Sequence, residues 1–284
     1  MSSVKGGLVI LKEMVNTLPP SEGKIAQYII DYPQEAILLT ALQLGENSKT
    51  SSAAVIRLCK SLGFNGFQEL KIRVAGDLQD RYLEGYRDIH PNEDYQAIIE
   101  KMTSNTIQTL KETTDIMSGT SLEKAVDALI HAKSIVFIGY GASYIAAKDA
   151  EQKFLRISKN AQSYSDMHMA ATSIANKGSD DVVVGISFSG ATSEVAKLLT
   201  LAKQRNATTI SITKYGNSLV SNISDIQLHT SAAKEATFRS GATSSRIAQL
   251  HLIDILFMCL ASKEYEQTIK YLDETRDAVA FLKE

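Results

Sequence analysis

The sequence is poor in cysteine, in proline and in long apolar runs. Its two cysteines, Cys59 and Cys259, lie far apart in apolar contexts, which favours buried thiols in a reducing compartment over a disulfide or a metal pair. Four prolines and no low-complexity tract argue against long disordered linkers. The apolar run over residues 8–11 meets Lys12 and Glu13 at once, so we expect a cytoplasmic protein without a signal peptide or membrane span.

A strong excess of one charge is also missing, because the net charge is −2 over 284 residues. This length allows two domains, and the overall charge carries no nucleic-acid signature. The charge is unevenly distributed, however. Residues 47–75 carry five cationic side chains and one anionic side chain, whereas residues 1–46 have a net charge of −2. A local basic face is typical of a modular DNA-binding domain, and a solvated helix face would show it too.

The first 80 residues show helical spacing and no convincing strand. The pattern predicts helices over 4–17, over 21–33 with Ser21 as the cap, over 33–39, from about Thr40, and over 51–62 closed by Gly63. The last two, separated by a turn at 46–49, form a helix-turn-helix whose second helix enters the major groove. On that helix we expect the core-facing residues to be Val55, Leu58 and Leu62.

Small side chains at the start of this second helix would let it enter the groove deeply. Arg57 and Lys60 project from other faces, where they reach phosphates or base edges. From spacing alone, a plain helical interaction bundle is an equal alternative. The candidate DNA-binding residues are Lys49, Thr50, Ser51, Ser52, Ala53, Ala54, Arg57 and Lys60.

The segment SSAAVIRLCKSLGFNGFQELK, residues 51–71, resembles the N-terminal domain of the RpiR family of bacterial transcriptional regulators. Ala54 stands where a threonine is usual, so any contact by that threonine is absent here. The resemblance continues into the second half and covers nearly the whole chain. The matching positions are Ser51, Val55, Arg57, Leu62, Gly63, Phe64, Gly66, Phe67, Glu69, Leu70 and Lys71.

After a polar linker near residues 76–92 and helices over 95–117 and 122–132, strands and helices alternate. This alternation predicts a parallel sheet covered by helices on both faces, and ligands of such sheets sit beyond the carboxyl ends of the strands. Strands are expected over 134–138, 161–164, 181–186, 208–213 and 226–228, and helices over 144–157, 167–174, 194–204, 244–260 and 264–282.

A hydroxyl-rich turn, Ser187 to Thr192, joins the strand over 181–186 to the next helix. The unpaired N–H groups and the dipole of a helix N-terminus favour an anion there, and three hydroxyls point to a bound phosphate. The alternative is that Ser189 or Thr192 merely caps the helix.

A second turn, Gly139 to Ser143, follows the strand over 134–138 and opens a helix like a dinucleotide-binding turn. Position 144 is tyrosine, so the third glycine of that fingerprint is missing, and no acidic residue ends the next strand. We therefore expect no nicotinamide or flavin cofactor. The turn fits a role beside the first one, sharing the phosphate or holding sugar hydroxyls.

Both turns resemble those of the SIS (sugar isomerase) domain, which implies a three-layer α/β domain with a five-stranded parallel sheet that binds a sugar phosphate. Residues 244–250 and 253–254 also fit its pattern, which usually packs at a dimer interface near the ligand. RVAGDL and GYRDI resemble the MurR-like subgroup and imply an amino-sugar 6-phosphate, N-acetylmuramic acid 6-phosphate first. The ligand-binding candidates are Gly141, Ser143, Ser187, Ser189, Gly190, Thr192 and Glu235.

SIS domains also occur in isomerases and lyases, so catalysis is the alternative function. It would need a general acid and base, for which Glu235 and His168 are candidates; the other four histidines show no metal-ligand spacing. With a DNA-binding module attached, we expect a repressor, with an activator as the alternative, rather than an enzyme. We expect no catalytic residues, cofactor or metal. The expected partners are operator DNA, a sugar-phosphate effector and further copies in a homodimer or homotetramer, but no membrane. The expected division is 1–80 DNA-binding, 81–120 linker and connecting helix, and 121–284 SIS.

Overall fold

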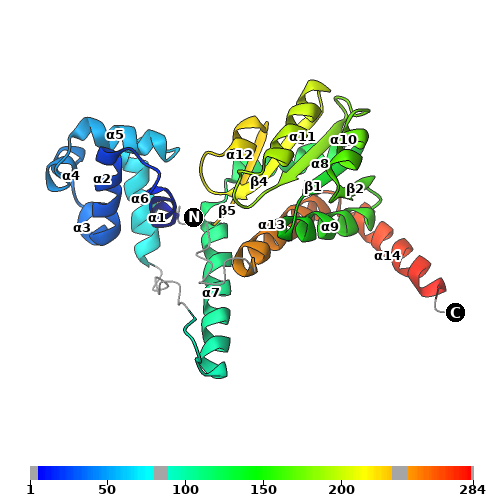
Figure 1. Ribbon diagram of the computed structural model, residues 1–284, viewed down its shortest axis with the longest axis horizontal. Helices are drawn as coiled ribbons and strands as arrows, with labels where there is room; N and C mark the ends of the chain where they lie inside the picture. The colour runs from blue at the N-terminus through cyan, green and yellow to red at the C-terminus, as the bar shows by residue number, and fades with distance from the viewer. Residues whose placement is uncertain (1–5, 80–88, 232–241, 283–284) are drawn as a thin grey trace. The chain divides into compact units, whose positions relative to one another are not determined.

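The computed structural model describes residues 6–79, 89–231 and 242–282 (Figure 1). The chain folds as two compact units. The first comprises residues 1–116 together with 231–237, and the second comprises 117–230 together with 238–284. The expected linker at 76–92 falls partly on the end of a helix and partly outside the described residues.

The described part of the first unit is helical. The predicted cap of the second helix is wrong: Pro19 occupies the N-cap position and Pro20 the first turn, where its missing N–H costs nothing, so Ser21 already lies inside the helix. The helices are α1 (Gly7–Met14), α2 (Pro20–Asp31), α3 (Pro33–Ala36), α4 (Ala41–Asn47), α5 (Ser52–Ser61), α6 (Phe67–Gln79) and α7 (Tyr95–Ile116).

Helices α4 and α5 form the expected helix-turn-helix. Thr40 and Gln43 build a reciprocal capping box at the start of α4. The Ser51 hydroxyl accepts the Ala54 N–H at 3.2 Å and so caps α5. The predicted inward face of α5 is confirmed, because Val55, Leu58 and Leu62 are all buried.

The second unit is built on a parallel sheet in the order β2-β1-β3-β4-β5. Helices α8, α9 and α13 cover one face, and α10, α11 and α12 cover the other, so the predicted three-layer α/β fold class is confirmed (Figure 1). The elements are α8 (Gly119–His131), β1 (Ser134–Gly139), α9 (Ala142–Leu155), β2 (Ala161–Tyr164), α10 (Met167–Ile174), β3 (Asp181–Ile186), α11 (Ser193–Gln204), β4 (Thr208–Lys214), α12 (Leu219–Ile223), β5 (Ile226–Thr230), α13 (Thr243–Lys263) and α14 (Tyr265–Phe281).

Both faces of the central strands are buried, which is why these strands are apolar without alternation. Along β1, Phe137 packs on the side of α9 and α13, while Val136 and Ile138 pack on the side of α10 and α11. The strand therefore contributes to two hydrophobic cores and is held rigidly between them.

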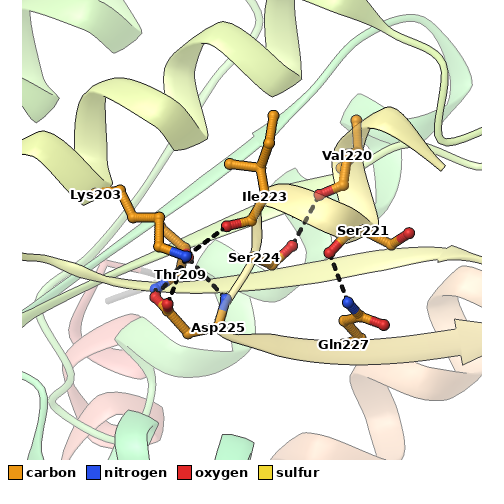
Figure 2. Close-up of polar contacts among 8 residues, drawn as sticks. All are labelled: Lys203, Thr209, Val220, Ser221, Ile223, Ser224, Asp225 and Gln227. Carbon is orange, nitrogen blue, oxygen red and sulfur yellow. Dashed lines mark hydrogen bonds and ion pairs between the residues drawn. The ribbon is translucent and has the colours of Figure 1, made fainter. Parts of the chain in front are cut away.

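A polar cluster closes the sheet near the start of β4 and β5 (Figure 2). The Asp225 carboxylate accepts hydrogen bonds from the Thr209 N–H at 3.0 Å and from its hydroxyl at 2.7 Å. The Lys203 ammonium pairs with Asp225 at 2.8 Å and donates to the Ile223 carbonyl. The cluster joins the end of α11 to the start of both strands, at the edge of the sheet opposite the carboxyl ends.

Helix α13 is, among the described residues, the one helix long and apolar enough to cross a membrane. Half of its apolar window is buried within the protein, and Leu252, Ile253 and Leu256 belong to the core on one face of the sheet. Its composition is that of a helix covering a sheet.

Candidate functional site

The order of the strands reverses between β1 and β3. From β1 the chain moves outward to β2 on one side, and from β3 it moves outward to β4 on the other. In open α/β sheets, ligands bind beyond the carboxyl ends of the strands at such a switch point. The two turns predicted to bind a ligand follow these two strands, with Gly141 as the N-cap of α9 and Thr192 as the N-cap of α11.

The turn after β3 is built around a pair of hydroxyls. Ser187 Oγ and Thr192 Oγ1 lie 2.8 Å apart, and Ser187 is buried. Thr192 occupies the N-cap position but makes no side-chain capping bond, so simple capping does not explain it. One proton of the pair lies between the two oxygens, and the other is free to be donated to an acceptor.

Ser189 lies at the exposed tip of this turn. Its Oγ accepts the Ala191 N–H at 3.2 Å, so its own proton can point toward a ligand. Gly190 has φ +68°, and a Cβ there would lie 2.2 Å from Ser218 Oγ, so only glycine fits. The Val220 N–H donates to the Gly190 carbonyl at 2.9 Å, which means that α12 supports the turn.

The turn after β1 receives support from α13. Gln249, which is 1% exposed, donates its side-chain amide to Ser143 Oγ at 3.1 Å. Because this oxygen accepts from Gln249, the Ser143 proton can be donated elsewhere. The sequence analysis included Gln249 within the family pattern over 244–250 but gave it no role at the site. Its signal was a polar side chain on the buried face of an otherwise apolar helix.

We call the donors gathered at this switch point the hydroxyl cradle; they are the hydroxyls of Ser143, Ser187, Ser189 and Thr192, at the N-terminal ends of α9 and α11. In α9 the Ser143 and Tyr144 N–H groups already donate to the Tyr140 and Gly141 carbonyls at 3.1 Å, so this helix end contributes through its dipole. The cradle therefore presents hydrogen-bond donors and positive helix ends to one ligand, which suits an anion such as a phosphate.

Tyr140 lies in the turn after β1. Burial raises the pKa of its hydroxyl, and the carboxylates of Glu194 and Asp166 raise the pKa further. That hydroxyl is buried and has no hydrogen-bond partner among the residues that the structure describes. It stays protonated at neutral pH.

Of the two predicted acid–base candidates, the structure describes His168. His168 is exposed on α10. Glu235, predicted to bind the ligand, lies outside the described residues. Within residues 6–79, 89–231 and 242–282, no three His, Cys, Asp or Glu side chains are grouped to hold a metal ion.

The predicted DNA-binding residues lie in the turn before α5 and along α5, from Ser52 in its first turn to Lys60 in its last. Ala54 is the exception: it is 1% exposed, because it lies on the inward face beside Val55, and it has no surface to offer DNA. The Ser51 hydroxyl already caps the helix. The exposed members are Lys49, Ser51, Ala53, Arg57 and Lys60, and the half-buried ones are Thr50 and Ser52.

Arg57 is held by an acidic side chain beneath it. Its Nε lies 3.8 Å from Oε1 of Glu22, which is buried on α2 and also accepts the Ser61 hydroxyl at 2.7 Å. The Arg57 side chain is 57% exposed, so its guanidinium stays available at the surface.

Comparison with known proteins gives matches in both halves of the chain. Residues 5–81 match the model of the helix-turn-helix domain of the rpiR family, and residues 128–259 match that of the SIS domain. The HTH-type transcriptional regulator YbbH of Bacillus subtilis is 49% identical over 96% of this chain and 97% of its own length. The HTH-type regulator TTE0211 of Caldanaerobacter subterraneus is 41% identical over 97% of this chain and 98% of its own.

Among solved structures, the NanR protein of Vibrio vulnificus complexed with ManNAc-6P superposes with a TM-score of 0.62. It is 27% identical and covers 97% of this chain and 99% of that one. The RpiR transcription factor of Sphaerobacter thermophilus, represented by its sugar isomerase domain, has a TM-score of 0.59 at 20% identity, over 64% of this chain and 99% of that one. The similarity to the Sphaerobacter domain shows a shared fold.

A helix-turn-helix unit joined to a sheet with a SIS-type ligand site defines a transcriptional regulator with a sugar-phosphate-binding domain. The identity to the Bacillus and Caldanaerobacter regulators extends over almost the full chain. This chain belongs to the RpiR family of HTH-type transcriptional regulators.

Proposed function

We propose that this regulator represses genes of amino-sugar catabolism and that an amino-sugar 6-phosphate, with N-acetylmuramic acid 6-phosphate as the first candidate, releases it from its operator. The observation that carries the proposal is the hydroxyl cradle at the switch point of the sheet, in the same chain as a helix-turn-helix. In this proposal, residues 1–80 bind DNA, 81–120 connect, and 121–284 sense the ligand.

The phosphate of the ligand lies in the hydroxyl cradle, where neutral donors and two helix ends neutralise it without a lysine or arginine in either turn. The proposed ligand-binding residues of the protein are Gly141, Ser143, Ser187, Ser189, Gly190, Thr192 and Glu235.

Two likenesses support an amino sugar. NanR, 27% identical to this chain, binds ManNAc-6P. The RVAGDL and GYRDI segments resemble the MurR-like subgroup, which favours the muramic acid derivative.

On the DNA side, α5 enters the major groove with its N-terminal end, and Lys49, Thr50, Ser52, Arg57 and Lys60 contact the operator. Two such helices in a homodimer or homotetramer read the two halves of a palindrome. The protein acts in the cytoplasm, where sugar phosphates and the chromosome meet. A ligand that weakens DNA binding must itself be bound less tightly by the DNA complex.

The relatives that match over the full chain are named as regulators, which supports binding without turnover. SIS domains also serve isomerases and lyases, so catalysis has to be tested directly. Pure protein is incubated with each candidate sugar phosphate and the products are followed by NMR. Steady turnover would refute a purely sensing role.

The deciding experiment is a gel shift on the DNA upstream of the protein's own gene. The ligand panel contains N-acetylmuramic acid 6-phosphate, ManNAc-6P and arabinose 5-phosphate, with inorganic phosphate as the control. We expect a specific complex without ligand, and its loss with N-acetylmuramic acid 6-phosphate at concentrations where inorganic phosphate has no effect. No specific complex on any genomic fragment would overturn the proposed function.

A further inference from the structure

The first residue after β5 is hydrogen-bonded to α7. The Ser231 N–H donates to Thr113 Oγ1 at 3.1 Å, and the Ser231 hydroxyl donates to Glu112 Oε2 at 2.9 Å. Ser231 and Thr113 are 1% and 0% exposed. Since β5 is parallel to β3, its carboxyl end lies at the same edge of the sheet as the hydroxyl cradle. A change at that edge can therefore reach Ser231 through the chain itself.

The last turn of α7 lies against the start of α1. Gly6 packs against the Asp115 carbonyl so closely that a Cβ at position 6 would lie 2.6 Å from the carbonyl oxygen. Its φ is +92°, which also disfavours any side chain. The end of α7 therefore cannot shift toward α1 without moving α1.

The same end of α1 is fixed to α6 by a buried carboxylate. Asp77 accepts the Gly6 N–H and the Leu8 N–H, each at 2.7 Å, on its two oxygens. This carboxylate from another helix takes the place of an N-cap side chain, because Gly6 has no side chain to cap α1. Gly7 also lies against the backbone of Val74, with 2.8 Å between its ideal Cβ and the Val74 nitrogen.

Helix α6 follows α5 in the chain and packs against it. The contacts therefore form a continuous series, here called the α7 relay: Ser231, then Glu112 and Thr113 on α7, then Asp115 against Gly6, then Asp77 on α6. Packed interiors do not deform continuously, so a displacement at one end is passed on as a shift of whole helices.

We propose that the α7 relay transmits the ligand signal from the carboxyl edge of the sheet to the helix-turn-helix. This inference rests on the proposed function, since it needs both a ligand and an operator. Ser231 and Glu112 act as positioning residues: they touch neither ligand nor DNA, and their hydrogen bond holds α7 to the first residue after β5. Removing their bond uncouples the two sites while each still binds its own partner.

The test compares full-length variants by three measurements. These are the operator Kd without ligand, the ligand Kd without DNA, and the ratio of operator Kd values with and without ligand. The ligands are those of the panel above. In the unmodified protein we expect this ratio to be about 10 or more, within the usual range for coupled sites.

In Ser231→Ala we expect the ratio to fall below about 2, while both separate Kd values change by less than about threefold. Glu112→Ala should behave alike, and it stands in for Ser231→Ala if that variant does not fold. Glu112→Gln keeps an acceptor for the Ser231 hydroxyl and should retain most of the ratio. Thr114→Ala is the matched control, because the Thr114 hydroxyl is exposed and donates only within α7, to Leu110.

Two failures are distinguishable. If the unmodified protein binds no operator, or if no sugar phosphate changes its operator affinity, both the proposed function and the relay are wrong. If the unmodified protein responds and Ser231→Ala and Glu112→Ala respond equally, only the relay is wrong. If Thr114→Ala lowers the ratio of operator Kd values as much as Ser231→Ala does, the relay is also refuted, because the loss would then reflect general weakening of α7.

Discussion

The side-chain amide of Gln249 donates to the Ser143 hydroxyl at 3.1 Å, although 106 positions separate the two residues. The bond lies under the turn after β1 and fixes the direction in which Ser143 can donate its own proton. Helix α13 thus supports the candidate ligand site by contacting the turn after β1.

Gln249→Leu should weaken sugar-phosphate binding by about fivefold, because losing one positioning hydrogen bond costs about 1 kcal/mol. Operator affinity without ligand should not change. Isothermal titration with N-acetylmuramic acid 6-phosphate measures the first quantity and a gel shift the second. Gln267→Leu on α14 is the matched control, because Gln267 is exposed and bonds only to Tyr271 on its own helix. Equal weakening in both variants would contradict the role of Gln249.

Ser189→Ala should abolish the ligand response and leave operator binding intact. Ser189 is the exposed member of the hydroxyl cradle, and its proton is free to be donated to a phosphate. A hydrogen bond to a charged group is worth about 1.5–3 kcal/mol, or a loss of about 10–150-fold in affinity. Ser193→Ala serves as the control, since the Ser193 hydroxyl donates to Glu194 next to it. An undiminished response in Ser189→Ala would remove Ser189 from the site.

Arg57→Ala should do the reverse, weakening operator binding by about 1–3 kcal/mol while sugar-phosphate affinity stays the same. Its ion pair with the buried Glu22 is long, and the Glu22 carboxylate keeps the hydrogen bond from Ser61, so the fold should lose little stability. Gel shifts at several salt concentrations show whether Arg57 contacts a phosphate, in which case the salt dependence falls by about one ion. Arg205→Ala, on the exposed end of α11, is the control for removing a positive charge. Equal operator affinity in the Arg57 and Arg205 variants would exclude Arg57 from the interface.

The polar cluster at Asp225 predicts a pH dependence of stability. Burial raises the pKa of Asp225, but hydrogen bonds from Lys203 and Thr209 outweigh it and hold the pKa below the usual value. A carboxyl whose pKa is lowered by folding stabilises the fold above its unfolded pKa, and this contribution is lost as the pH falls through the folded pKa.

Urea unfolding at neutral pH should show Asp225→Ala to be less stable by about 1–2 kcal/mol, with the difference shrinking below about pH 4. The side chain is 41% exposed, so solvent screening keeps the effect small. Asp180→Ala, at an exposed carboxyl before β3, is the comparison. A difference that persists unchanged at about pH 3 would show that the charge of Asp225 is not involved.

Apolar periodicity predicted much of the fold. The strands over 161–164 and 181–186 and the helix over 167–174 have the predicted bounds, because buried parallel strands and their turns leave strong local patterns. Helix α12 was not predicted. It has five residues, and what stabilises it is the Ser218–Ser221 capping box and the contact of Val220 with Gly190 rather than any periodic face.

The candidate site shows the same division. Ser187 and Thr192 could be found from their own sequence, since one turn holds both of them. Gln249 and Ser231 act through partners more than 100 positions away, and no local pattern indicates which helix a polar side chain will meet. Ala54 was misjudged because its place in the motif suggested an outward position, whereas the rotation of α5 turns it inward.

The unit that contains the DNA-binding helices is discontinuous in sequence, since residues 1–116 are joined by the segment 231–237 that follows the last strand. Because the first unit consists of two sequence segments with part of the second unit between them, no single cut in the chain separates the two units. During evolution, a sensor domain exchanged at a single joint near Ile116 would arrive without a partner for Glu112 and Thr113. Such a hybrid would keep both binding activities and no longer connect them, so working exchanges must carry the returning segment along with the sheet.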